Sequence, residues 1–130
     1  MQSSLGPIEI TVMMPLFSKA RPRVTSRGTF MPKEYKAKQK EMLRQIKEQY
    51  SGEPLTGPLK VVLELRGEGR ADIDNMVGAF FDVANKVLWV HDRVSILPEL
   101  SVKWTKCKKE LSCWDVKIYD LSEEQGDLGL

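Results

Sequence analysis

The stretch from residue 59 to residue 88 restricts the fold more than any other part of the chain. Residues 59–66 are mainly leucine and β-branched residues and predict a strand, and residues 67–70 predict a turn. Residues 74–88 predict a helix that is apolar around most of its surface and is therefore mostly buried. Its polar residues follow helical spacing along one stripe: Asn75, Gly78, Asp82, Asn85 and Lys86.

The flanking sequence supplies the rest of a sheet and a second helix. Residues 8–14 alternate apolar and polar side chains and predict a strand, and residues 33–50 are rich in helix formers. Residues 101–106 and 113–119 also alternate and are joined by a charged connection, so they predict an antiparallel hairpin. Between the first strand and the first helix, residues 16–32 predict a basic loop or a short ribbon.

Together these elements predict an α+β fold. We expect a single compact domain over residues 1–120, in which a mixed sheet of about four strands packs with two helices. Residues 121–130 are expected to form an acidic, disordered tail. A length of 130 residues with 42% hydrophobic and 29% charged residues fits one globular domain and excludes collagen-like, coiled-coil and wholly disordered chains.

The chain shows no sign of a membrane or export segment. No apolar run approaches the roughly 20 residues that a membrane span needs. Residues 1–5 carry neither the basic nor the apolar region of a secretory signal, so we expect a cytoplasmic protein. The only cysteines, Cys107 and Cys113, and the only histidine, His91, are too few for a structural zinc site. We expect the two thiols to be reduced and half-buried.

Charge is divided unevenly between the two halves of the chain. Residues 1–60 hold 11 Lys and Arg against 5 Asp and Glu, whereas residues 61–130 hold 9 against 13. A basic first half indicates a surface that grips a polyanion, and an acidic second half indicates a place where carboxylates gather. The candidate phosphate contacts lie in the basic loop and on the first helix: Lys19, Arg21, Arg23, Arg27, Lys33, Lys36, Lys38, Lys40, Arg44 and Lys47.

Asp72 and Asp74 are the first candidates for chemistry, because they stand two residues apart where a strand passes into a helix. In extended backbone such residues project to one side. Asp92 could join them only if the turn after the second helix returns the chain partway along it. Three carboxylates within about 4 Å would repel by roughly 4 kcal/mol per pair. Either one or more of them would stay protonated, or a hard cation such as Mg²⁺ or Mn²⁺ would neutralise them.

The same residues could also have simpler roles or take part in other chemistries. A single aspartate at a helix start is most often only an N-cap, so the pair alone is weak support for a site. A haloacid-dehalogenase type of phosphatase would need a hydrophobic strand running directly into the first aspartate. An EF-hand would need an oxygen ligand at Met76 and a glycine at Val77. The sequence meets neither requirement.

The run Arg70-Ala71-Asp72-Ile73-Asp74-Asn75-Met76, followed by Phe81-Asp82 and by Trp89-Val90-His91-Asp92-Arg93-Val94, resembles the RusA family of Holliday-junction resolvases. The segments Lys19-Ala20-Arg21-Pro22-Arg23 and Thr29-Phe30-Met31-Pro32-Lys33 also resemble the early region of that family. The resemblance covers most of residues 8–119. Members are often carried by phages and prophages, which places the expected setting in a bacterial cell or a phage-infected host.

The resemblance implies the roles of particular residues. Asp72, Asp74 and Asp92 match the three catalytic, metal-binding aspartates, and the implied cofactor is Mg²⁺, with Mn²⁺ able to substitute. Residues 18–21 and 68–75 match DNA-contacting segments, which adds Ser18, Arg70 and Asn75 to the basic candidates. The implied partners are four-way DNA junctions and a second copy of the chain, with no membrane and no other protein. A homodimer suits the reaction, because resolving a junction takes two symmetric cuts.

One departure from the family pattern bears on activity. The family usually has a lysine four residues after its second aspartate, and this chain has Gly78 there. Lys19, Arg21 or Arg70 could supply the missing cation. The implied reaction is in-line attack on the phosphodiester by a metal-activated water, giving paired symmetric nicks. The alternatives are a junction-binding protein with weak or no catalysis and a nuclease for flaps or forks.

Overall fold

A four-stranded mixed sheet forms the centre of the molecule. The computed structural model describes residues 7–122, apart from the side chain of Arg23. The strand order is β1-β6-β4-β5, where β1 is Ile8–Val12, β4 is Leu59–Gly67, β5 is Glu99–Lys106 and β6 is Cys113–Asp120. β6 is antiparallel to both β1 and β4, whereas β4 and β5 are parallel. The predicted α+β class and mixed four-stranded sheet are confirmed.

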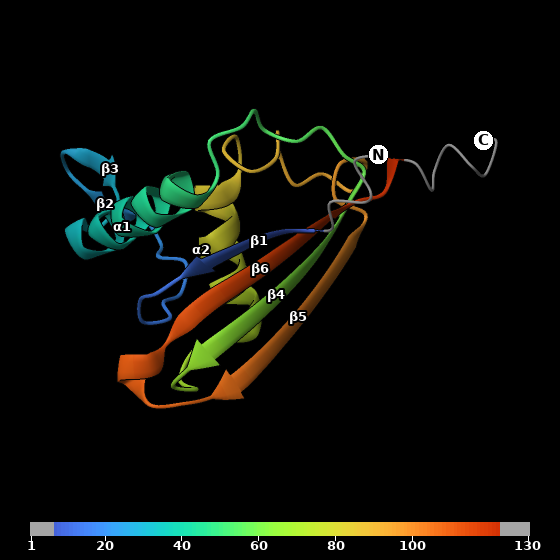
Figure 1. Ribbon diagram of the computed structural model, residues 1–130. Helices are drawn as coiled ribbons and strands as arrows, with labels where there is room; N and C mark the ends of the chain where they lie inside the picture. Colours follow the sequence, from blue (N-terminus) through green and yellow to red (C-terminus); the bar gives the residue numbers. More distant parts are fainter. Residues whose placement is uncertain (1–6, 123–130) are drawn as a thin grey trace.

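Two helices lie against one face of this sheet (Figure 1). α1 spans Lys33–Gln49 and buries Tyr35, Met42 and Ile46, while α2 spans Ile73–Ala84 and buries Met76, Ala79, Phe80, Val83 and Ala84. Alternate residues of β4 face the helices and are buried, and the intervening ones are half-buried on the open face. This period of two is the one that its sequence predicted.

The expected hairpin between residues 101–106 and 113–119 is wrong. β5 and β6 do not pair with each other, because β4 lies between them and bonds to both. β4 is the longest strand and buries every second residue in the core, which favours a central position for it. The connection through the short 3₁₀ helix η2, Lys109–Leu111, carries the chain past the end of β4 instead of folding it back as a tight hairpin.

The order β4-α2-β5 is a crossover unit, which fixes the direction of α2. Two parallel neighbouring strands need a connection from the end of the first strand back to the start of the second, and α2 lies in that connection. It begins near the end of β4 and leads towards the start of β5, as Figure 1 shows. The two ends of α2 therefore lie at opposite ends of β4.

The basic loop of residues 16–32 contains the short ribbon that its sequence allowed. β2, Arg23–Thr25, pairs antiparallel with β3, Gly28–Phe30. Figure 1 shows this hairpin beside the start of α1, away from the sheet. Its tip is closed by the Thr25 hydroxyl, which accepts from the Arg27 N–H at 3.1 Å and donates to the Gly28 carbonyl at 3.2 Å.

Several smaller expectations can also be compared with the structure. Both cysteines are free thiols, as expected, and Cys107 is half-buried, but Cys113 is buried in the sheet. Within residues 7–122, no helix has the length and apolarity to cross a membrane. The expected acidic tail lies outside the described residues beyond Ser122. Leu121, at its start, is buried and donates its N–H to the Pro58 carbonyl at 2.9 Å.

Candidate functional site

Asp72 and Asp74 lie together at the start of α2 with exposed side chains. Asp72 is the N-cap residue and has extended backbone, yet its carboxylate forms no capping hydrogen bond. Among the described side chains, neither carboxylate takes part in an ion pair. The positive end of the helix dipole favours anionic groups here. Both carboxylates are therefore free to bind a cation from solution, and the capping role does not account for them.

The loop that leads to Asp72 is held by close packing against β5. A Cβ atom placed on Gly69 would lie 2.7 Å from Cζ2 of the Trp104 ring. Only glycine lets the backbone pass so close to the indole. Trp104 thus supports the segment that places the acidic pair, while more than a third of its own surface remains exposed (37%).

The N-terminal basic segment docks onto the first turn of α2. The Lys19 N–H donates to the Asn75 carbonyl at 2.9 Å. This bond joins the stretch 18–21 to the end of the stretch 68–75, the two stretches that the sequence indicated as DNA contacts. Arg21 and Arg70 are exposed in these stretches. Basic and acidic groups of the candidate site are therefore adjacent, as a site for an anion held through a cation requires.

Lys19 occupies the space that Gly78 leaves open. A Cβ atom placed on Gly78 would lie 3.4 Å from Cδ of Lys19, so the lysine stem crosses the helix surface at the glycine. Its Nζ is 3.6 Å from Oδ1 of Asp82, one turn further along α2. Asp74, Gly78 and Asp82 are spaced by four residues and share one side of the helix. Of the three cations that could replace the family's lysine, Lys19 lies on that side.

Asp82 joins the two helices. The Tyr35 hydroxyl, on α1, donates to Oδ2 of Asp82 at 3.3 Å. Burial, together with the nearby negative charge of Asp82, raises the pKa of Tyr35 to about 12. Asp82 is therefore paired with Tyr35 and Lys19, two partners that the sequence gave no means of identifying.

Asp92 lies at the other end of α2. It follows Trp89, which is fully buried and forms bridges with Leu55 and Asn85. It precedes Ile96, whose carbonyl accepts from the N–H of Leu59 at the start of β4. The 12 residues of α2 extend about 18 Å, so Asp92 and the acidic pair are separated by roughly a helix length. A three-aspartate site within one chain would need the segment after α2 to run back along the helix. In the structure it does not do so.

The described residues 7–122 accordingly contain no group of three His, Cys, Asp or Glu side chains able to hold a metal ion. Asp72 and Asp74 offer two hard oxygen ligands, which suit Mg²⁺ or Mn²⁺. Within the described part of the chain, no third such ligand joins them. His91, beside Asp92, accepts a long hydrogen bond from the N–H of Arg93 through Nδ1 at 3.4 Å.

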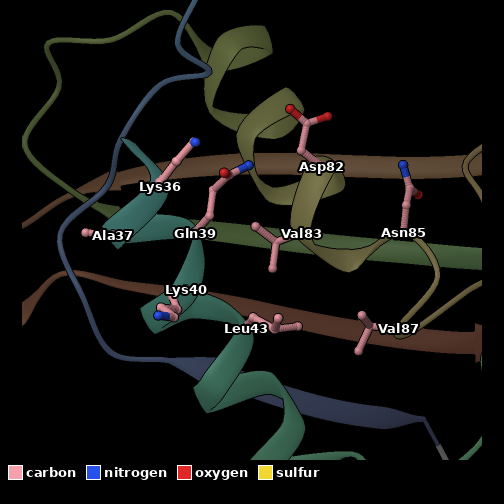
Figure 2. A pocket seen from close by; sticks show the side chains of 9 residues that line it. All are labelled: Lys36, Ala37, Gln39, Lys40, Leu43, Asp82, Val83, Asn85 and Val87. Atoms are coloured by element: carbon pink, nitrogen blue, oxygen red, sulfur yellow. The ribbon is translucent and has the colours of Figure 1, made fainter. Parts of the chain in front are cut away.

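A groove of about 670 Å³ lies between α1 and α2, away from the three aspartates. Figure 2 shows Lys36 and Lys40 from α1 on one side and Asp82 and Asn85 from α2 on the other. Gln39 and four apolar side chains form the rest of its wall: Ala37, Leu43, Val83 and Val87. The groove therefore adds two lysines to the basic surface but no acidic pair.

The other basic candidates differ in whether their side chains are already held in ion pairs. Arg27 is exposed at the tip of the β2–β3 hairpin. Arg44 is engaged within α1, where Glu41 and Glu48 accept from it at 2.7 Å and 2.5 Å. Hydrogen bonds from Arg44 and Gln45 lower the pKa of Glu41 to about 2. Arg44 is thus a poorer phosphate contact than its position on the helix suggested.

Comparison with known families identifies the chain. Residues 14–119 match the family described as Endodeoxyribonuclease RusA, so the chain belongs to this family of Holliday-junction endonucleases. The match covers the basic segment, the acidic pair, α2 and Asp92. It confirms the resemblance drawn from the sequence and places the chain among the DNA-cleaving enzymes. No match is found among curated proteins.

Proposed function

We propose that this protein resolves four-way DNA junctions by paired, symmetric nicks that depend on Mg²⁺, with Mn²⁺ able to substitute. The observation that carries the proposal is the acidic pair Asp72 and Asp74. It is exposed, uncapped and bordered by the docked basic segment of residues 18–21. The family match supports the same substrate and reaction class. We place the reaction in the cytoplasm of a bacterial cell or a phage-infected host.

Different residues of the chain have different roles in cleavage. A phosphodiester is an anion and repels both a nucleophile and free carboxylates. The acidic pair would hold the hard cation, which when bound would neutralise charge on the phosphate and lower the pKa of a water molecule. The exposed Arg21, Arg27 and Arg70 hold the neighbouring phosphates and set the position of the strand, and Arg23 is assigned the same role from the sequence. Ser18 and Asn75 add neutral hydrogen-bonding groups beside them.

Lys19 supplies the cation that acts beside the acidic pair. Its stem lies on Gly78, and its ammonium rests on Asp82 in an ion pair with both side chains accessible to solvent. Such exposed pairs contribute little free energy, so an incoming phosphate can replace Asp82 as the partner. A flexible lysine from the N-terminal segment then serves where a lysine on the helix would otherwise stand.

A junction-binding protein with weak or no catalysis is the second candidate, because Gly78 removes a cation from α2. The two candidates predict different results for Gly78→Lys. If Lys19 already supplies the charge, the substitution leaves nicking unchanged or lowers it by crowding a second ammonium against the first. If a cation is lacking, it raises nicking.

A panel of labelled substrates tests the proposed function. The purified protein is incubated with a four-way junction, a flap, a fork and linear duplex, in Mg²⁺, in Mn²⁺ and with chelator. We expect metal-dependent nicks at symmetric positions of the junction and far fewer in the other substrates. Binding of the junction without nicks in either metal would support the second candidate. Equal cutting of flaps or forks would overturn the selectivity.

A further inference from the structure

The connection between β5 and β6 carries a cluster of lysines in the acidic half of the chain. Lys106 ends β5, Lys108 precedes η2, and Lys109 begins it. All three are exposed, and among the described side chains none of them takes part in an ion pair. Arg66 on β4, by contrast, is held by two carboxylates of the sheet. The three lysines form the β5-end patch, which is available to bind an anion.

Two contacts hold the β5-end patch beside the loop that leads to the acidic pair. The Cys107 N–H donates to the Gly67 carbonyl at 3.2 Å, and the Trp104 ring packs on Gly69. Gly67 is five residues before Asp72, so the length of the chain limits the separation of their Cα atoms to at most about 17 Å. Along one DNA strand this corresponds to about five nucleotides at roughly 3.4 Å each. The patch is thus near enough to contact a strand that lies on the acidic pair.

Alternation along β5 directs Lys106 to the helix side of the sheet. In the parallel register Lys106 is aligned with Gly67 and Trp104 with Leu65, and both of these β4 residues are buried in the core. Successive side chains of a strand point to opposite faces, so Lys103 lies on the open face. Lys106 therefore shares its face with α2, whose start carries the acidic pair.

The acidic pair lies between the β5-end patch and the basic N-terminal segment. Trp104 packs on Gly69 shortly before the pair, and the Lys19 N–H donates to the Asn75 carbonyl just after it. Figure 1 shows η2 and the ends of β4 and β5 at one end of the molecule, apart from the β2–β3 hairpin. Positive charge is therefore present on two sides of the two aspartates.

We propose that the β5-end patch binds DNA phosphates on the side of the acidic pair opposite to residues 18–21. This inference rests on the proposed function and assigns it a second group of phosphate contacts. Lysine binds phosphate as a point charge and does not require one fixed geometry, which suits a short connection with exposed side chains. Contacts on both sides of the scissile phosphate fix the position of the strand, whereas contacts on one side leave it free to swing away from the site.

A salt titration of junction binding tests the β5-end patch. Lys106→Met and Lys108→Met are combined in one chain, and binding to a four-way junction is measured by gel shift in chelator. We expect about 10-fold weaker binding at moderate salt and a slope of log affinity against log salt that is smaller by about two, because two phosphate contacts are lost. The matched control combines Lys103→Met with Lys117→Met, which removes the same charge from the open face of the sheet. Equal changes in the two double variants would overturn the inference.

Neutral phosphates locate the contacts along the DNA. Synthetic junctions carry one methylphosphonate, which lacks the phosphate charge, at successive positions around the branch point. We expect the Lys106→Met, Lys108→Met variant to become insensitive to this change at one set of positions, and Arg21→Met at another. Loss of sensitivity at the same positions in both would overturn the inference while leaving the proposed function. If the wild type nicks nothing in either metal, the proposed function fails, and the binding map still decides whether the two basic groups contact different phosphates.

Discussion

The two ends of α2 are built in opposite ways. The start, at Asp72, is open to solvent and uses glycine, exposed carboxylates and a docked basic loop. The end is packed: Leu88 and Trp89 are fully buried, and the Trp89 indole donates to Oδ1 of Asn85 at 2.7 Å. A helix anchored at one end can present reactive groups at the other without loss of position. The three aspartates are nevertheless divided, with Asp72 and Asp74 at the start of α2 and Asp92 after its end.

The largest effect on nicking is expected from a substitution at the start of α2. Asp74→Asn keeps the shape of the side chain but removes a negative ligand, so we predict a loss of nicking of about 1,000-fold or more. Junction binding, measured by gel shift, should persist or tighten, because one repulsive charge against DNA is lost. Nicking at the wild-type rate would remove Asp74 from the site.

Separating the two copies should have the next largest effect. Leu100→Lys places a charge on the exposed side of β5, and we predict a shift from dimer to monomer in sedimentation and a loss of nicking of about 100-fold. Met13→Lys is the matched control, because Met13 is also an exposed apolar residue but follows β1 at the opposite edge of the sheet. Equal effects of the two variants would argue against a contact between two copies at the exposed side of β5.

Lys19→Met tests the lysine seated on Gly78. The substitution keeps the apolar stem and removes the ammonium, so we predict a loss in the maximal nicking rate of about 30-fold with binding changed only a few-fold. Adding Gly78→Lys to this variant should restore much of the rate. The control is Lys117→Met, which removes an exposed lysine of β6. If the nicking rate of the control variant falls as far as that of Lys19→Met, the loss reflects net charge alone.

A smaller effect is expected at the tip of the β2–β3 hairpin. Arg27→Met should weaken junction binding a few-fold and lower the slope of log affinity against log salt by about one, because one phosphate contact is lost. The measurement is a salt titration of binding. An unchanged slope would show that the hairpin tip does not reach the DNA.

The smallest effect concerns the link between the helices. The pKa of Tyr35 is raised to about 12 in the folded protein, above its ordinary value of 10.0, so its contribution to stability is present below pH 10 and is lost as the pH rises through 12. Tyr35→Phe should destabilise the protein by less than about 1 kcal/mol at pH 7. In urea unfolding this difference should shrink above pH 10, and a difference that grows would contradict the assignment.

The packed part of the molecule was predictable and the assembled site was not. Period-two strands and the apolar surface of α2 follow from residue patterns, so the α+β class and the buried faces were predicted. The pairing of β5 was not, because alternation indicates a strand without naming its neighbour, and β4 lies between the two strands that appeared to form a hairpin.

The same limit applies to the site. Asp72 and Asp74 are two residues apart, so local geometry alone places them together. Asp92 depends on the direction of a helix, and Lys19 depends on a loop that docks through one backbone bond to Asn75. The space at Gly78 was visible in the sequence as a missing side chain, but the side chain that fills it comes from 59 residues earlier. Contacts of this kind are set by tertiary packing.

Cleavage of a plasmid that extrudes a cruciform tests the central claim most directly. Two sites acting together on one junction convert the supercoiled circle to linear DNA, whereas separate single nicks give a relaxed circle. We predict a linear product in Mg²⁺ that disappears with chelator. A plasmid that is bound but left supercoiled in Mg²⁺ and in Mn²⁺ would contradict the account.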